Sequence, residues 1–212
     1  MTTRKLRQWP VPRRLRWVVS QFDESLSAYP FRVIAGQTGI RFRVEPLSSK
    51  HDRAAFSRGE AALDNYLHKQ AGQDVRKHVA AVFMLTPDGK IVAGYYTLSQ
   101  FSVELGAVPE EVAQELAKYR AVPATLLGRL AVAKQFRGKG LGERLLVDAL
   151  RLSLGAGKLI VSAAVVVDAK DEGAANFYKK YRFIQLPKIP NRLFLPMRTI
   201  EEMMAAGDPA EA

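Results

Sequence analysis

Three glycines and two basic residues lie at the junction of a predicted buried strand at 126–133 and a predicted amphipathic helix at 141–154, with the third glycine inside the first turn of that helix. They form the segment Arg137-Gly138-Lys139-Gly140-Leu141-Gly142. Glycine has no Cβ atom, so a ligand can come close to the backbone at such positions. The first N–H groups of a helix lack intrahelical partners and lie at the positive end of the helix dipole, which favours an anion. The segment predicts a pyrophosphate-binding loop, and the alternative is a tight strand-to-helix turn.

This loop departs from two common nucleotide-binding patterns. It lacks the Gly-Lys-Ser/Thr ending of a nucleoside-triphosphate loop. The chain also shows no clear ribose-binding acid on a second parallel strand at the spacing of a dinucleotide fold. Both patterns are therefore disfavoured as explanations of the glycines.

Tyr178 is a candidate proton donor within a predicted short helix at 171–180. A phenol has an ordinary pKa near 10, so it is protonated at neutral pH and can donate. The spacing is equally compatible with a core tyrosine on an amphipathic helix.

The sequence offers no strong general base. No motif places His51, His68 or His78, and we interpret each as a surface or packing residue. A lysine amine, with a pKa of about 10.4, must be deprotonated before it can attack, whereas an α-amine has a pKa of roughly 7.7–8.0. An α-amine acceptor is therefore consistent with a site that has no dedicated base.

Two further groups of charged residues need an explanation. Arg129 interrupts an apolar strand, and a buried charge is costly unless it is paired. It is expected either to meet a carboxylate or to face the cofactor or acceptor cleft. Asp168, Lys170 and Asp171 end a predicted central strand, where open α/β sheets place ligands. Capping of the following helix is the favoured alternative for these three residues.

Hydrophobic periodicity predicts a mixed α/β sheet with one phosphate-binding crossover. Thr86-Pro87-Asp88-Gly89 has the composition of a turn and predicts an antiparallel hairpin between two apolar runs. Nearly continuous apolar runs are typical of central strands that are covered on both faces. The predicted strands are 40–44, 79–85, 91–99, 126–133, 159–167, 183–186 and 192–195, and the predicted helices are 59–77, 109–119, 141–154 and 171–180.

The chain has 212 residues, and its length and composition indicate a single domain, which we expect at residues 40–200. It is expected to lie between a basic, poorly ordered extension at 1–39 and a tail at 201–212. The net charge is +11, of which residues 1–17 contribute +6, and this favours a polyanionic partner. The chain has no cysteine, which excludes disulfides, cysteine metal sites and a cysteine nucleophile. We expect no metal, no membrane span and a cytoplasmic location.

Two signatures together resemble the Gcn5-related N-acetyltransferases. The first is Arg137-x-x-Gly140-x-Gly142 after a strand. The second is the run Ala174-Ala-Asn-Phe-Tyr-Lys-Lys-Tyr-Arg-Phe183. Many members have a glycine before the closing phenylalanine, where this chain has Arg182. The resemblance covers about residues 40–200. It implies a mostly antiparallel mixed sheet with flanking helices, in which a splayed strand pair binds acetyl-CoA.

The same resemblance assigns roles to individual residues. It implies that the backbones of Leu130, Ala131 and Val132 bind the pantetheine arm and polarise the thioester carbonyl. The backbone from Arg137 to Gly142 then takes the pyrophosphate. Tyr178 becomes the general acid for the leaving thiolate, and Asn176 a further acetyl-CoA contact. Arg129 is a candidate acceptor-binding residue.

A closer resemblance is to the acetyltransferase toxins of bacterial toxin–antitoxin pairs. This resemblance implies acetylation of the α-amine of aminoacyl-tRNA, inhibition by a small ribbon-helix-helix antitoxin, and possible homodimers. It rests on five blocks in order, the first preceded by Phe56 and Gly59: Leu-Asp-Asn-Tyr-Leu at 63–67, Gly-Tyr-Tyr-Thr-Leu-Ser at 94–99, Leu-Gly-Arg-Leu-Ala-Val at 127–132, Val-Asp-Ala-Lys-Asp at 167–171 and Arg-Leu-Phe-Leu-Pro-Met at 192–197.

Two other functions stay open at this point. One is an acetyltransferase for a protein N-terminus, a polyamine or a drug amine. The other is a nucleic-acid-binding module whose glycine loop holds backbone phosphate and catalyses nothing. Acetyl-CoA binding separates the module from the enzymes, and the basic segments disfavour a polyamine acceptor.

Overall fold

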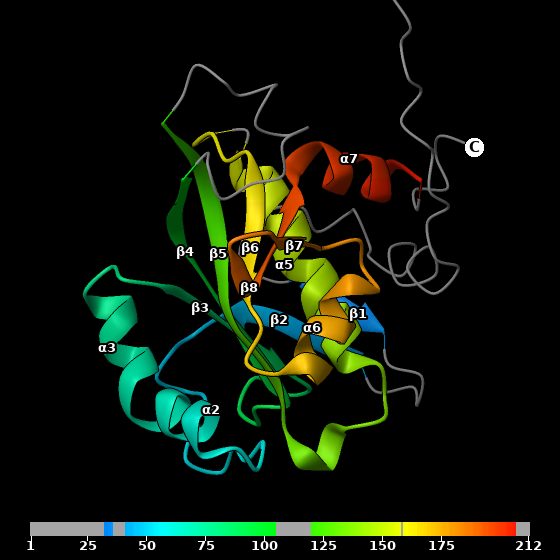
Figure 1. The fold of residues 1–212 in the computed structure, drawn as a ribbon. Helices are drawn as coiled ribbons and strands as arrows, with labels where there is room; N and C mark the ends of the chain where they lie inside the picture. The colour runs from blue at the N-terminus through cyan, green and yellow to red at the C-terminus, as the bar shows by residue number, and fades with distance from the viewer. Residues whose placement is uncertain (1–31, 36–40, 105–119, 158, 207–212) are drawn as a thin grey trace, which may run out of the picture.

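The computed structural model describes residues 32–35, 41–104, 120–157 and 159–206. Its centre is an eight-stranded sheet in the order β1-β2-β3-β4-β5-β6-β8-β7 (Figure 1). All neighbouring strands are antiparallel except β5 and β6, which run parallel. The strands are β1 (Arg32–Ala35), β2 (Arg41–Pro46), β3 (Ala81–Thr86), β4 (Gly94–Glu104), β5 (Ala121–Val132), β6 (Ala164–Asp168), β7 (Ile184–Leu186) and β8 (Ile189–Pro196).

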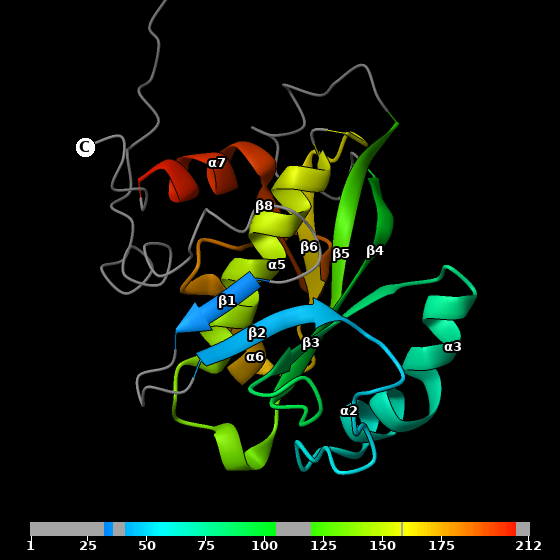
Figure 2. The same ribbon diagram turned by 180° about the vertical axis from the view of Figure 1, so that it is seen from behind.

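Helices cover both faces of the sheet (Figures 1 and 2). One face packs against α5, α6 and α7, and the opposite face packs against the α2–η2–α3 segment. None of the described helices is long and apolar enough to cross a membrane. The helices are α2 (Ala61–Asn65), the π-helical turn η2 (Tyr66–Gln70), α3 (Ala71–Arg76), the 3₁₀ turn η4 (Lys134–Phe136), α5 (Leu141–Gly157), α6 (Glu172–Lys179) and α7 (Met197–Ala205).

The hairpin of β3 and β4 shows why the sheet needs cover on both faces. Successive side chains of a strand point to opposite faces. Tyr95 accordingly packs in the cluster under η2, and Tyr96 packs in the cluster under α5. The predicted turn closes the hairpin, because the Gly89 N–H donates to Thr86 Oγ1 at 2.7 Å and Gly89 has a φ of +85°. The hairpin prediction is confirmed.

Strands β5 and β6 pair over only a short distance and then diverge. Their ladder joins three residue pairs, Ala124 to Leu126 against Ala164 to Val166. Just beyond this ladder, Gly128 has no pairing partner in β4, because its neighbours Leu127 and Arg129 pair with two consecutive residues of β4. Such a β-bulge bends the strand that carries it. The predicted splayed strand pair is therefore present, and the bulge accounts for its position.

One predicted strand is shorter than expected. The prediction of 159–167 is wrong in its first half, because the parallel pairing with β5 begins only at Ala164. Leu159, Ile160 and Val161 are exposed instead, Leu159 by 87%. The apolar run reflects a surface loop joined to a buried strand, which periodicity alone does not separate.

The predicted domain limits of 40–200 are too narrow at both ends. Strand β1 pairs with β2 although it lies in the predicted extension. Helix α7 continues to Ala205, and Met203 within it is fully buried in the core. The remaining residues of 1–39, those of the tail beyond 206, and the predicted helix at 109–119 lie outside the described residues.

The burial of Met203 gives a stability prediction. Met203→Ala should lower the free energy of unfolding by about 2–5 kcal/mol, because it removes buried methylene groups and leaves a cavity. The exposed Glu201→Ala should change it by less than about 0.5 kcal/mol. Urea unfolding measures both, and equal midpoints for the two variants would show that α7 is not part of the folded core.

Candidate functional site

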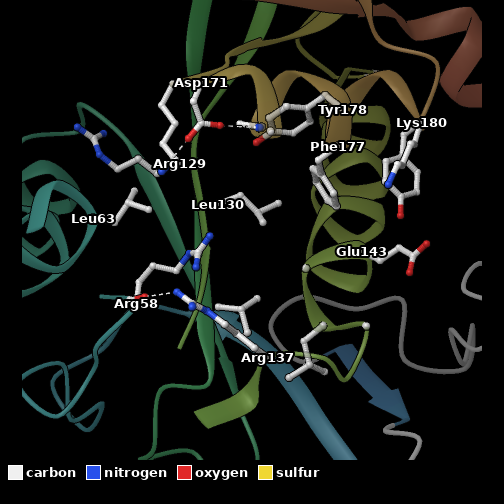
Figure 3. A pocket seen from close by; sticks show the side chains of 18 of the residues that line it. Arg58, Leu63, Arg129, Leu130, Arg137, Glu143, Asp171, Phe177, Tyr178 and Lys180 are labelled. Carbon is white, nitrogen blue, oxygen red and sulfur yellow. Dashed lines mark hydrogen bonds and ion pairs between the residues drawn. The ribbon is translucent and has the colours of Figure 1, made fainter. Parts of the chain in front are cut away.

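A cavity of about 940 Å³ opens where β5 and β6 diverge. It extends to both sides of β5. Arg58, Leu63 and Arg129 lie on the side of α2, and Glu143, Phe177 and Tyr178 lie on the side of α5 and α6 (Figure 3). The cavity is lined by Arg58, Leu63, Gly128, Arg129, Leu130, Val132, Phe136, Arg137, Gly138, Gly140, Leu141, Gly142, Glu143, Asp168, Lys170, Asp171, Gly173, Ala174, Phe177, Tyr178, Lys180 and Tyr181.

The backbone of β5 faces this cavity at alternate residues. The Ala133 N–H donates to the Ala93 carbonyl at 2.9 Å, and the Ala131 carbonyl lies against Gly94 of β4. Alternate residues of an antiparallel strand direct their N–H and C=O groups to opposite sides. The groups of Leu130 and Val132 therefore point away from β4, toward the diverging β6.

This geometry corrects one of the three predicted backbone contacts. Leu130 and Val132 line the cavity, whereas Ala131 is buried on the opposite face and hydrogen-bonds within the sheet. The family resemblance implied a contiguous triplet, but the two-residue period of a strand allows only alternate residues to face one edge.

The glycine loop forms an open concave backbone at the start of α5. Gly138 and Gly140 have φ of +75° and +71°, a conformation that L-residues with side chains rarely adopt. A Cβ atom at Gly138 would meet nothing within 4 Å, so this backbone is accessible. The Gly140 carbonyl accepts the Arg144 N–H at 3.3 Å. The N–H groups of the following first turn are therefore free of intrahelical partners, as an anion site requires.

The two basic residues of this loop differ in position. Arg137 lines the cavity, and its guanidinium donates to the carbonyl of Arg58 across it. Lys139 does not line the cavity. Its Nζ atom lies 5.4 Å from the centroid of the Phe136 ring. A direct pyrophosphate contact from the Lys139 side chain is not supported by this arrangement.

Helix α6 brings Tyr178 to the cavity. Asp171 begins the helix by accepting the Ala174 N–H at 2.7 Å, so the predicted cap is present. About two turns after Asp171, the Tyr178 ring packs against Phe177 and Phe183, with ring centroids 5.2 and 5.3 Å apart. Asn176 points to the exposed side of the helix and does not line the cavity. Its predicted contact with acetyl-CoA is therefore not supported.

The Tyr178 phenol is held in its protonated form. Burial raises its pKa above the ordinary value, because a phenolate would lose its hydration. No hydrogen bond joins its hydroxyl to another residue in the described part of the chain. A protonated hydroxyl that lines the cavity can donate to a ligand there.

The other charged residues at the β6 end are largely neutralised by neighbours. Arg192 holds Asp168 with two hydrogen bonds of 2.7 and 2.8 Å. Lys170 lies 2.5 Å from Glu60 and 3.2 Å from Asp171. All three of Asp168, Lys170 and Asp171 line the cavity, so the capping and ligand-site interpretations are compatible.

None of the three histidines lines the cavity. His51 is buried and hydrogen-bonds Glu45 at 2.7 Å, and a His68 ring nitrogen lies 2.9 Å from the Phe56 carbonyl. His78 is exposed, at the end of α3. Their interpretation as packing or surface residues is confirmed by these positions.

Sequence reasoning missed several residues that line the cavity. Leu63 belongs to a block that resembles the toxins, and Arg58 lies ahead of that block, between Phe56 and Gly59; this was the only signal for the two residues. Glu143 could have been found from its place directly after the glycine loop. Phe177 and Tyr181 flank Tyr178 at helical spacing but look like ordinary core positions. The remaining missed residues are Gly128, Phe136, Gly173, Ala174 and Lys180.

A family model described as an acetyltransferase (GNAT) domain matches residues 79–185. The chain is 32% identical over 177 residues to the "Probable toxin TacT" of Sinorhizobium fredii, with 79% of this chain and 98% of that protein covered. It is 35% identical over 152 residues to the "tRNA-acetylating toxin" of Mycobacterium tuberculosis, with 72% of this chain and 90% of that protein covered.

Solved structures show the same likeness in three dimensions. A tyrosine-to-phenylalanine mutant of KacT superimposes with a TM-score of 0.72 at 31% identity, covering 76% of this chain and 98% of that one. AtaT complexed with acetyl-methionyl-tRNAfMet gives a TM-score of 0.72 at 29% identity, with the same coverage. AtaTR bound with acetyl-CoA gives 0.68 at 30% identity, covering 76% of this chain and 97% of that one.

The raised pKa of Tyr178 predicts that this residue does not contribute to tyrosine ionisation at moderately alkaline pH. The chain has seven tyrosines. Between about pH 8 and 10.5, the rise in ultraviolet absorbance from tyrosinate should be the same in the parent and in Tyr178→Phe, because an exposed phenol titrates near 10 and a buried one above it. Circular dichroism confirms that both stay folded. A smaller rise in the variant would show that Tyr178 ionises in this range.

Proposed function

Since this chain belongs to the GNAT acetyltransferase family, we propose that it transfers the acetyl group of acetyl-CoA to the α-amine of an aminoacyl-tRNA. The observation that carries the proposal is the cavity between β5 and β6, which has backbone donors on one wall and Tyr178 on the other. The relatives supply the substrate class, because they include a tRNA-acetylating toxin and AtaT complexed with acetyl-methionyl-tRNAfMet.

The described residues fit acetyl-CoA in three places. The pyrophosphate fits at the glycine loop. There it would meet the accessible backbone of Gly138 and Gly140, the free N–H groups of the first turn of α5 and the cation of Arg137. The backbone of Leu130 and Val132 can hydrogen-bond the amide groups of the pantetheine arm. The arm would then lie along β5 in the place where β6 no longer pairs with it. This arrangement directs the thioester toward the part of the cavity shared by β5 and α6.

The reaction is direct acyl transfer. The amine nitrogen bonds to the thioester carbonyl carbon, and the oxyanion that forms is stabilised by a backbone N–H donor of β5. The carbon–sulfur bond then breaks, and the thiolate takes the phenolic proton of Tyr178. The amine releases one proton to solvent, and Tyr178 recovers one from solvent.

The charges in the cavity support an α-amine acceptor attached to a polyanion. Of the described carboxylates that line the cavity, Asp168 is paired with Arg192, Asp171 caps α6, and Glu143 lies in the first turn of α5 beside the glycine loop, so none is an unengaged base on the acceptor side. Without a strong base, an amine with a pKa of roughly 7.7–8.0 reacts more readily than lysine. Arg58 and Arg129 line the acceptor side, which is the side of α2, and the net charge is +11. Both features suit tRNA.

The relatives also support a biological context. AtaT has been solved with the C-terminus of the antitoxin AtaR, and KacTA with DNA. The function that we propose for this chain is accordingly that of a translation-blocking toxin, active in the cytoplasm and neutralised by a small ribbon-helix-helix antitoxin.

The direct test is incubation with labelled acetyl-CoA and total charged tRNA. Label should enter charged tRNA and leave it as an N-acetyl amino acid when the ester is hydrolysed by mild base. Deacylated tRNA is the negative control and should stay unlabelled. Transfer to other amines with none to charged tRNA would overturn the acceptor assignment and leave the acetyltransferase activity in place.

The same assay tests Tyr178. Tyr178→Phe keeps the ring and should lower turnover by roughly 10²–10⁴, while its affinity for acetyl-CoA stays nearly unchanged. Tyr96→Phe is the matched control. It removes a hydroxyl that donates to Asp148 at 2.6 Å in the core, so it costs stability without touching the cavity. Near-normal turnover in Tyr178→Phe would show that another group protonates the thiolate.

A further inference from the structure

The guanidinium of Arg129 lies over an aromatic ring on the acceptor side of the cavity. Its guanidinium carbon lies 3.6 Å from the centroid of the Tyr66 ring, which is a close cation–π contact. The side chain lines the cavity next to Leu63 (Figure 3). Arg129 therefore faces a cleft, as expected. The contact with Tyr66 that sets its position was not predicted.

Tyr66 is itself part of a rigid aromatic stack. It is 2% exposed and begins the π-helical turn η2, a distortion that often marks functional sites. Its ring stacks on Tyr95 with centroids 6.2 Å apart, and Phe56 meets Tyr95 edge-on at 5.4 Å. The Tyr95 hydroxyl donates to the Leu63 carbonyl at 2.9 Å. Burial and the Asp74 carboxylate raise the pKa of Tyr66 to about 12, so the ring stays neutral.

The contact with Tyr66 uses the face of the Arg129 guanidinium and does not use its N–H groups as donors. Within the described residues no carboxylate forms an ion pair with Arg129. Lys170, by contrast, is neutralised by Glu60 and Asp171. A guanidinium that stacks through its face can present two parallel N–H donors at its edge, the arrangement that recognises phosphate.

We propose that Arg129, positioned by Tyr66, binds a backbone phosphate of the single-stranded 3′ end of the acceptor RNA. The inference rests on the proposed function and adds the contact that brings the acceptor end to the thioester. The phosphates of acetyl-CoA are not the partner, because the glycine loop that suits them lies at the start of α5, and Figure 3 shows Arg129 on the opposite side of β5 from Glu143 in the first turn of that helix. Arg129 touches the acceptor, and Tyr66 acts through Arg129 as a positioning residue.

The test uses the trinucleotide CCA and full-length protein saturated with acetyl-CoA, so that the coenzyme site is blocked. Calorimetry should show that Arg129→Gln weakens trinucleotide binding by on the order of 10–100-fold, the loss typical of a hydrogen bond to a charged group. Its affinity for acetyl-CoA should stay unchanged. Lys69→Gln is the matched control, because it removes one exposed charge from the same π turn without lining the cavity. It should leave the binding of CCA within about twofold of the parent, since an exposed charge outside the site contributes little.

Salt dependence separates a phosphate contact from a structural role. Each phosphate contact on a single strand contributes about 0.7 to the slope of log affinity against log salt. Arg129→Gln should lower the slope by about that amount. Tyr66→Leu removes the ring and keeps the Arg129 cation, so CCA should bind more weakly with an unchanged salt slope. Tyr66→Phe keeps the ring and should bind CCA as the parent does. Adding Tyr66→Leu to Arg129→Gln should cause no further loss, because the two act as one unit.

The outcomes distinguish this inference from the proposed function. Parent protein that does not bind CCA, or Arg129→Gln that binds with unchanged affinity or slope, would overturn the phosphate contact. Arg129-dependent binding of CCA without acetyl transfer to charged tRNA would support the contact and contradict the proposed function instead. Tyr66→Leu that matches the parent would overturn the positioning role even if it melts at a lower temperature.

Discussion

The N–H and C=O groups of Leu130 and Val132 lie at a sheet edge inside the molecule, because β5 and β6 stop pairing after three residue pairs. Buried backbone groups of this kind cost free energy unless they find partners. The bulge at Gly128 creates the opening, and a Cβ atom there would lie only 3.2 Å from Thr97 Oγ1. The opening therefore acts as a preformed place for an extended, amide-containing ligand, and the remaining features of the site are arranged around it.

Each side of the opening is built by a different face of the sheet. On one side α5 supplies a helix N-terminus behind the glycine loop, and α6 supplies Tyr178 in a wall of aromatic rings. On the other side η2 supplies the Tyr66 platform under Arg129. The two ligands of a transfer reaction can thus approach the same strand from opposite faces. Their reacting atoms meet where the strand lacks its neighbour, and no side chain has to cross the sheet.

Local chemistry predicted those parts of the structure that depend on a few adjacent residues. The Pro-Asp-Gly turn, the start of α5 after the glycines and the cap at Asp171 were all predictable, because each is set by backbone geometry within one turn. The resemblance to known families supplied the splayed strands. Leu159 to Val161 were misjudged, since an exposed apolar loop has the same composition as a buried strand. Two features could not be predicted: the π turn at Tyr66, and the fact that Leu130 and Val132 face the open edge while Ala131 does not. Both depend on strand register and tertiary packing, which a few adjacent residues do not encode.

The central claim is that the free edge of β5 receives the co-substrate, and hydrogen exchange at single-residue resolution tests it most directly. Amide exchange should be followed for Leu130, Ala131 and Val132 with and without saturating acetyl-CoA. We expect at least one of the amides of Leu130 and Val132 to become strongly protected, because these groups gain a hydrogen-bond partner only when the ligand is bound. The Ala131 amide, which already faces β4, should change little. Unchanged exchange at both Leu130 and Val132 under saturating ligand would contradict the account.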